Sequence, residues 1–102
     1  MNLRLLEPDW PVSSKVRAYS TVRTGGGSLP PFAQLNLGAH VGDLPSSVAY
    51  NRALLANELD LSPPLSFLEQ VHGTKVELLD QALTQAVAAD AAVTFQRSLP
   101  CV

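Results

Sequence analysis

The residues in this sequence that are best suited to chemistry lie around His72, in the run Gln70-Val71-His72-Gly73. A neutral imidazole binds zinc or copper well and titrates near neutral pH, so His72 is a candidate metal ligand and general base. Gln70 beside it could orient the ring or a substrate. The alternative is a turn histidine that only hydrogen bonds to the backbone, and the sequence leaves both interpretations open.

The other histidine, His40, lies three residues before Asp43. A carboxylate at this distance could fix the tautomer of an imidazole, as carboxylates do behind metal ligands. The competing interpretation, which we favour, is a polar loop in which Asp43 caps the helix that follows. The two histidines do not have the spacing of a local metal-binding pair, so any metal that they share must be assembled by folding.

Three glycines, Gly25 to Gly27, follow Arg23 and could offer backbone amides and a guanidinium to an anion such as phosphate. A phosphate loop of the nucleotide-binding type leads into a helix, however, and Pro30-Pro31 prevents one here. A plain turn is therefore favoured. Cys101 is the only cysteine, which excludes an internal disulfide, and its apolar neighbours are typical of a buried strand residue rather than a nucleophile.

Three further polar residues have no decided role. Asp90 stands among small residues and either begins a strand or faces a cavity. Asn51 and Arg52 are most simply solvated or packing residues, although an arginine there could bind a loop carbonyl. A catalytic zinc needs about three protein ligands, and this sequence offers one good candidate, so the predicted site is incomplete.

The elements that must position these residues begin with a strand over 15–22, where apolar and polar residues alternate. The glycines and prolines then predict a long surface loop, and residues 35–38 fit either a strand or an extended loop. A helix is predicted from Pro45 to about Asp60, with a serine as its cap and Val48, Leu55 and Leu59 on one face. Pro63-Pro64 would stop it.

The second half predicts strands over 65–71 and 75–79, joined by a tight turn that places His72 at the end of a strand. A short helix is expected over 81–89 because the segment is rich in alanine and leucine, and a strand over 90–95. Residues 99–102 read as the start of another element. The order predicts an α+β fold rather than a doubly wound sheet.

The composition is that of one globular domain, and the net charge of −2 with seven scattered basic residues gives no patch for a phosphate backbone. Nucleic acid is therefore not an expected partner. No apolar run is long enough to cross a bilayer, so no membrane association is expected. Together with the single cysteine, this predicts a cytoplasmic protein.

An ordered series of motifs carries a family resemblance. It comprises Pro8-Asp9-Trp10-Pro11, Thr21-Val22-Arg23-Thr24-Gly25-Gly26, Leu35-Asn36-Leu37-Gly38, His40-Val41-Gly42-Asp43, Asn51-Arg52, Gln70-Val71-His72-Gly73 and Ala89-Asp90-Ala91. In this order the sequence resembles the N-terminal part of the laccase-domain (YfiH-type) family of purine nucleoside phosphorylases. Residues 1–102 would then be the first part of a single domain with an α+β fold, in which mixed β-sheets are layered with helices.

The resemblance implies a zinc site made from one histidine, which His72 matches, and from a later cysteine and a later histidine. Cys101 lies a few residues ahead of that cysteine and does not take its role. The family is described as cleaving adenosine, inosine and 5'-methylthioadenosine with phosphate and as deaminating adenosine. The resemblance therefore predicts a purine nucleoside and phosphate as substrates. The candidate substrate-binding residues are Arg23, Asn36, His40, Asp43 and Gln70.

Other activities ascribed to the family are copper-dependent polyphenol oxidation and amidase editing of a peptidoglycan precursor. A multicopper oxidase needs more histidines than the two present, which makes copper the less favoured metal. A different class of hypothesis is that these 102 residues alone form a catalytically inert fragment or an interaction module. In that case exposed strand edges would favour self-association.

Overall fold

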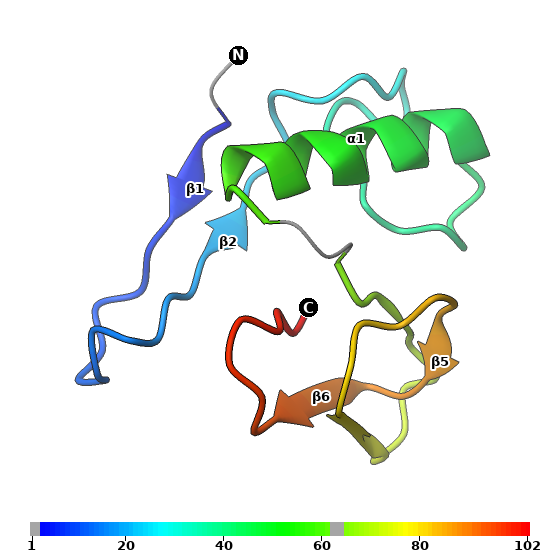
Figure 1. Cartoon of the computed structure of the whole chain (residues 1–102). Coiled ribbons are helices and arrows are strands. Elements are labelled where there is room, and N and C mark those ends of the chain that lie inside the picture. The colour runs from blue at the N-terminus through cyan, green and yellow to red at the C-terminus, as the bar shows by residue number, and fades with distance from the viewer. Residues whose placement is uncertain (1–2, 62–64) are drawn as a thin grey trace. The chain divides into compact units, whose positions relative to one another are not determined.

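The computed structural model describes residues 3–61 and 65–102, which divide into two compact units (Figure 1). One unit ends at Glu58 and the other begins at Leu59, and each is described by itself. The described residues form one α-helix, one antiparallel strand pair and two parallel strand pairs. The predicted α+β class is confirmed.

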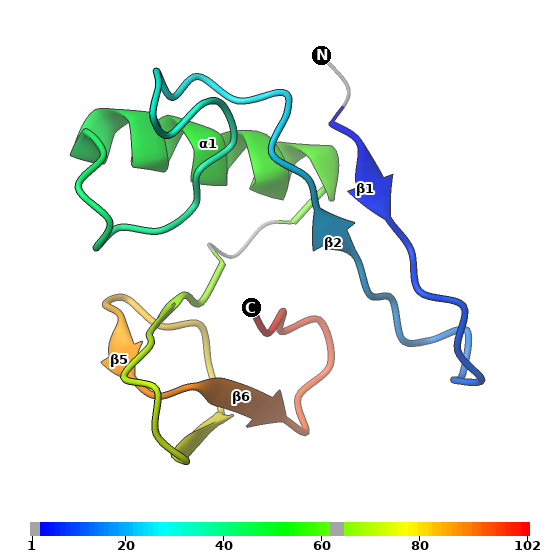
Figure 2. The same ribbon diagram turned by 180° about the vertical axis from the view of Figure 1, so that it is seen from behind.

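In the first unit, β1 (Leu5–Leu6) pairs antiparallel with β2 (Ser20–Thr21). The two strands lie side by side near one end of the helix, as both views show (Figure 2). The predicted strand over 15–22 is therefore correct only for its last part. Lys15 instead belongs to a turn, in which its amide donates to Ser13 Oγ, because β1 is too short to pair with a longer strand.

The helix α1 (Pro45–Glu58) confirms the predicted helix, although it begins differently from expectation. Pro45 takes the first helical position, where its missing amide costs nothing, and the carbonyl of Leu44 accepts the first bonds from Ser47 and Val48. The predicted serine cap is thus wrong. At the other end Asp60 has a φ of 53°, the left-handed conformation that commonly closes a helix. The predicted stop at Pro63-Pro64 lies outside the described residues.

The core of the first unit forms where the loop before α1 packs on the helix. Its buried apolar side chains are Leu3, Leu35, Val48 and Leu55. The amide of Leu3 donates to Glu58 Oε1 at 2.7 Å and so ties the start of the chain to the end of α1. Residues 35–38, which fitted either a strand or a loop, are a loop.

The second unit contains β3 (Leu68–Glu69), β4 (Val76–Leu79), β5 (Val87–Ala88) and β6 (Ala91–Thr94). The two strands predicted on either side of His72 exist in shortened form, but they do not pair with each other. Instead β3 pairs with β5 and β4 pairs with β6, both in parallel. The segment that contains β3 and β4 therefore runs alongside the segment that contains β5 and β6.

The predicted helix over 81–89 is wrong, whereas the predicted strand over 90–95 is confirmed as β6. Val87 and Ala88 pair with Leu68 and Glu69 as β5, and this long-range pairing outweighs the local preference of alanine and leucine for helix. Near the end of the chain, Cys101 forms an isolated parallel bridge with Ser66. The residues most deeply buried in this unit are Leu79, Ala89 and Ser66.

One face of the β4–β6 pair is apolar and exposed. Strand alternation and the register, which sets Val76 opposite Ala91 and Leu78 opposite Val93, place these side chains on the same face. Phe95, which follows β6, has 86% of its surface exposed. Parallel strands are usually covered on both faces, so this face is unusual. Self-association remains a prediction from the sequence.

Candidate functional site

His72 lies in a loop that the parallel register forces outward. The pairing of β3 with β5 ends at Glu69 and Ala88, and the pairing of β4 with β6 starts at Val76 and Ala91. Between these points one segment has six residues, 70–75, while the other has only two. The longer segment must therefore bulge, and His72 lies within this bulge rather than at the end of a strand as predicted.

The carboxylate of Asp90 holds this loop. Its Oδ1 accepts the amides of Val71 at 3.0 Å and His72 at 2.7 Å, and its Oδ2 accepts the amide of Gly73 at 2.7 Å. Three successive backbone donors thus converge on one side chain. At the centre His72 has a φ of 57°, a left-handed conformation in which histidine occurs more often than most residues.

This arrangement has an electrostatic consequence for Asp90. The hydrogen bond from the amide of Gly73 lowers the pKa of the carboxyl most, with further lowering from the amides of His72 and Val71 and the charge of His72. Partial burial opposes these effects. The net result is a carboxyl pKa below its usual value, so Asp90 is ionised at neutral pH and accepts hydrogen bonds without carrying a proton of its own.

The side chains of His72 and Gln70 are both exposed, so they are accessible to a ligand. The imidazole suits zinc by its chemistry. Within residues 3–61 and 65–102, however, no three histidine, cysteine, aspartate or glutamate side chains gather in a way that could hold a metal ion. The described residues therefore do not complete a metal site, and His72 stands as one potential ligand.

In the first unit, Asn51 organises the loop that precedes α1. Its side chain is fully buried, and Oδ1 accepts the amide of Gly27 at 2.8 Å. Its Nδ2 donates to Ser28 Oγ at 2.8 Å, to the carbonyl of Asn36 at 2.9 Å and to the carbonyl of Gln34 at 3.2 Å. One helix residue therefore bonds to four residues of the loop.

Asp43 continues this network. Its Oδ2 accepts Ser28 Oγ at 2.6 Å and Asn36 Nδ2 at 3.1 Å, and its Oδ1 accepts the amide of Leu44 at 2.8 Å. The hydrogen bond from Ser28, aided by those from Asn36 and Leu44, lowers the pKa of the carboxyl against an opposing effect of burial. Asn36 and Asp43 are thus brought together, and Asp43 supports the loop just before the helix.

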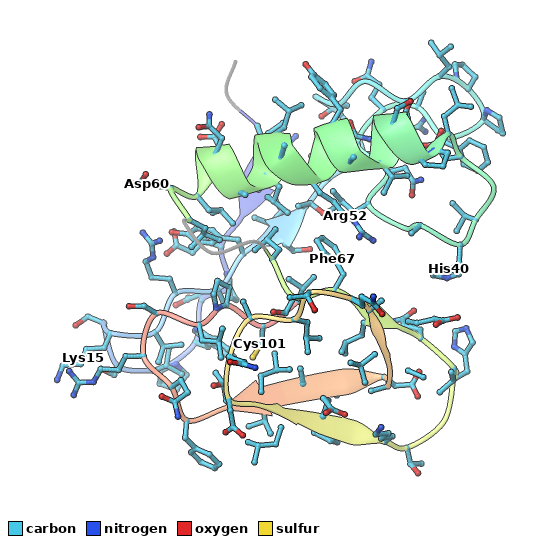
Figure 3. All side chains as sticks on the ribbon, turned by 45° about the vertical axis from the view of Figure 1, so that its right-hand side comes forward. Lys15, His40, Arg52, Asp60, Phe67 and Cys101 are labelled. Atoms are coloured by element: carbon cyan, nitrogen blue, oxygen red, sulfur yellow. The ribbon has the colours of Figure 1, made fainter. Side chains whose placement is uncertain are left out.

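His40 does not share in the hydrogen bonds that Asp43 makes with these three partners. Its side chain is exposed, and Figure 3 shows it at the outer edge of the loop that precedes α1. Among the described contacts, the carboxylate of Asp43 is used by Ser28, Asn36 and Leu44. The expectation that Asp43 fixes the tautomer of His40 finds no support in this geometry.

Arg23 and the glycine loop are held by internal hydrogen bonds. Arg23 donates from Nη2 and Nε to the carbonyl of Ala33 at 3.0 and 3.3 Å. The amide of Gly25 donates to Gln34 Oε1, and that of Gly27 donates to Asn51. Two of the three glycine amides are therefore already used, which fits the turn better than an anion cradle, while the guanidinium of Arg23 is exposed.

Arg52 has the binding role that the sequence allowed, whereas Cys101 is exposed and is not the buried strand residue that its apolar neighbours predicted. Arg52 reaches from α1 to the carbonyl of Leu37, with Nη2 at 2.8 Å and Nε at 2.9 Å (Figure 3). It binds a loop carbonyl, as was considered from the sequence. Partial desolvation still raises the pKa of the Cys101 thiol, which reduces the fraction of reactive thiolate.

Asp90 and Asn51 are the residues whose importance the sequence did not reveal. Both make several hydrogen bonds to partners at least 15 residues away, so the motifs that contain them give no indication of these bonds. The available signal was a short polar side chain in an otherwise apolar or small-residue setting, such as Asp90 between Ala89 and Ala91. Such residues are usually retained in a fold only when their hydrogen bonds are satisfied.

Comparison with known proteins decides the family. Residues 17–102 match the family described as multi-copper polyphenol oxidoreductase laccase. The chain belongs to this family. Its relatives include a purine nucleoside phosphorylase of Pseudomonas aeruginosa, 44% identical over 94% of this chain, and one of Corynebacterium glutamicum, 47% identical over 87%. The chain spans 38% of the length of each of these two relatives.

Solved structures agree with this assignment. A protein of Neisseria meningitidis superposes with a TM-score of 0.80 at 39% identity, covering 88% of this chain and 36% of its own. YlmD of Geobacillus stearothermophilus gives 0.74 at 33% identity, covering 84% and 36%. The resemblance to an N-terminal part of the laccase-domain family is confirmed. In the described residues, no helix is long and apolar enough to cross a membrane.

Proposed function

We propose that this chain is the N-terminal part of a purine nucleoside phosphorylase, in which phosphate replaces the purine base on the ribose of a nucleoside. The observation that carries the proposal is the 44% identity, over 94% of the chain, to the Pseudomonas aeruginosa protein of that name. The substrates are then phosphate and adenosine, inosine or 5'-methylthioadenosine. Deamination of adenosine by the same protein is part of the proposal, as is a cytoplasmic location.

His72 is the central residue of the proposed site. It offers an exposed imidazole on a loop whose backbone is held by three hydrogen bonds, which suits a group that must be presented to a ligand in one position. We assign it as one ligand of a zinc ion, with the remaining ligands outside the described residues, and as the catalytic imidazole. Bound zinc would supply a Lewis acid to the reaction.

Substrate binding is assigned to Arg23, Asn36, His40 and Asp43 in the first unit and to Gln70 in the second, each considered within its own unit. Arg23 offers a positive charge and N–H donors to phosphate. Gln70 and His40 are exposed polar side chains that are available to a nucleoside, whereas Asn36 and Asp43 act by shaping the loop around His40. An Arg23→Lys variant keeps the charge but loses the planar fork, so its KM for phosphate should rise more than its KM for the nucleoside.

The test compares wild type with His72→Asn in the longest protein that carries this chain. Asparagine is chosen because it tolerates the left-handed φ of 57°, so the loop is preserved while the imidazole is removed. Phosphate-dependent release of hypoxanthine from inosine, ammonia release from adenosine and bound zinc are measured on each protein. We expect His72→Asn to lose turnover and zinc together, with a thermal unfolding midpoint equal to that of the zinc-free wild type.

The outcomes separate the roles of His72. Loss of turnover with zinc retained would leave the imidazole as an acid or base and would refute the ligand assignment. Equal turnover in wild type and variant would refute any catalytic role. Without phosphorolysis in the wild type the proposed function fails, and the chain is better regarded as an inert fragment or an interaction module.

The description of the family favours a second candidate, copper-dependent oxidation of polyphenols. It is tested on the same preparations after loading with copper, by oxidation of a phenolic substrate in air. If the rate of oxidation depends on His72 and is higher than the rate of phosphorolysis, polyphenol oxidation becomes the favoured function and phosphorolysis the second. Amidase action on a peptidoglycan precursor is distinguished by the same comparison with that substrate.

A further inference from the structure

The loop that carries His72 needs an anchor, because nothing in its own sequence fixes its shape. Residues 70–75 belong to no strand. His72 has a left-handed φ, which residues other than glycine seldom adopt. Such a conformation persists only where surrounding contacts determine it. Among the described residues, Asp90 supplies three such contacts, one to each amide of residues 71–73.

Asp90 is itself rigidly placed. Its amide donates to the carbonyl of Lys75 at 3.1 Å, which extends the pairing of β4 with β6. The preceding amide, that of Ala89, donates to the carbonyl of Glu69 at 3.1 Å and extends the pairing of β3 with β5. Ala89 and Asp90 therefore stand at the junction of both strand pairs, and their two amides tie the two ends of the His72 loop, at Glu69 and Lys75.

A carboxylate at position 90 is also chemically suited to accept these three hydrogen bonds. Three amides point at two oxygens, so the acceptor must offer lone pairs on both atoms. An asparagine in the same position can offer only one oxygen. Its NH2 group would face either the amide of Gly73 or those of Val71 and His72, donor against donor, and at least one hydrogen bond would be lost.

We propose that Asp90 is the positioning residue of the proposed active site: its carboxylate holds the amides of Val71, His72 and Gly73 so that the imidazole of His72 is presented from one fixed turn. This inference rests on the proposed function, because a fixed imidazole matters to turnover only if His72 acts in the reaction. Asp90 touches the backbone of the loop and acts on the substrate only through His72.

The experiment compares Asp90→Asn with the matched variant Asp80→Asn in the longest protein that carries this chain. Asp80 is exposed and lies outside the His72 loop, so Asp80→Asn makes the same aspartate-to-asparagine change without affecting residues 71–73 directly. Amide hydrogen exchange of residues 71–73 is measured by NMR, and phosphorolysis of inosine is measured with kcat normalised to the folded fraction. Normalisation removes any loss of activity that comes only from lower stability.

In Asp90→Asn we expect exchange of the Gly73 amide to accelerate by about tenfold or more, as for loss of one charge-assisted hydrogen bond. Exchange at the buried Leu79 should stay unchanged. The normalised kcat should fall by roughly tenfold to a hundredfold, as for a misplaced catalytic group, with KM for inosine nearly constant. Asp80→Asn should match the wild type in all four of these quantities.

Unchanged exchange at residues 71–73 in Asp90→Asn would overturn the inference. So would unchanged turnover in a protein whose activity is lost in His72→Asn. If the wild type shows no phosphorolysis, the proposed function fails separately, and the exchange data still decide whether Asp90 holds the turn. The wild type adds a test without any variant: amides 71–73 must exchange more slowly than that of the exposed Gln85, and equal rates would refute the anchoring.

Discussion

Replacement of Asn51 by alanine should strongly destabilise the first unit, because this side chain is the main link between α1 and the loop before it. Three hydrogens are engaged at Asn51: the amide hydrogen of Gly27 on Oδ1, and the two hydrogens of Nδ2, which are shared among Ser28, Gln34 and Asn36. None of these groups regains a partner from alanine.

The expected loss can be worked out from these bonds. At a net contribution of about 1 kcal/mol for each engaged hydrogen, the three together contribute roughly 3 kcal/mol. Alanine recovers about 0.5 kcal/mol through its higher helix propensity. The net loss is then about 2–3 kcal/mol, a large share of the roughly 5–15 kcal/mol that holds a typical domain together.

The assay is urea unfolding followed by helical circular dichroism, which reports on the first unit because α1 is the only helix among the described residues. With a urea slope of about 1–2 kcal/mol per molar, the midpoint should fall by roughly 1–3 M. The matched control is Asn57→Ala, the same change at an exposed position of α1, which should leave the midpoint unchanged or slightly higher. Equal midpoints for the two variants would refute the role given to Asn51.

Three further predictions concern single positions. Gly26→Ala should destabilise the first unit by about 1–3 kcal/mol, because a Cβ there would lie 2.4 Å from the carbonyl oxygen of Gln34 and 2.6 Å from Asn51 Oδ1. Gly73→Ala, whose Cβ would meet Asp90 Oδ2 at an ordinary 3.6 Å, should change stability by less than about 0.5 kcal/mol; similar urea midpoints for the two variants would contradict this steric argument. Because folding lowers the pKa of Asp43, its carboxylate stabilises the folded state above the unfolded pKa of about 4, and this stabilisation is lost as the pH falls through the lower folded value. Urea unfolding across the acid range should therefore show a steeper loss of stability in wild type than in Asp43→Asn, and parallel curves would show that Asp43 makes no such contribution.

The parts of the fold that depend on neighbouring residues were predictable from the sequence. The helix over Pro45–Glu58 was predictable because Val48 and Leu55 recur on one of its faces, although the serine predicted as its cap does not cap it. The helix prediction for residues 81–89 was wrong for the opposite reason. Val87 and Ala88 form a strand because they pair with residues almost twenty positions away. Local propensity carries no information about such partners.

The candidate site divides in the same way. His72 was recognisable by residue type and by the motif around it, and its exposure is consistent with a functional side chain. The role of Asp90 in holding the His72 loop was not recognisable, because the hydrogen bonds from residues 71–73 to Asp90 depend on the register of two strand pairs. Likewise, Asn51 was taken for an ordinary helix residue, since only the folded loop reveals its four partners.

The junction at Ala89 and Asp90 has a consequence for how this chain can change in length. Only these two residues separate β5 from β6, and each strand pairs with a different partner. Inserting or deleting one residue there would shift one register by one position and turn every side chain of that strand to the opposite face. The connection between β4 and β5, residues 80–86, carries no such double constraint. Changes in length should therefore be tolerated better between Leu79 and Val87 than at Ala89 and Asp90, where the register of a strand pair would shift.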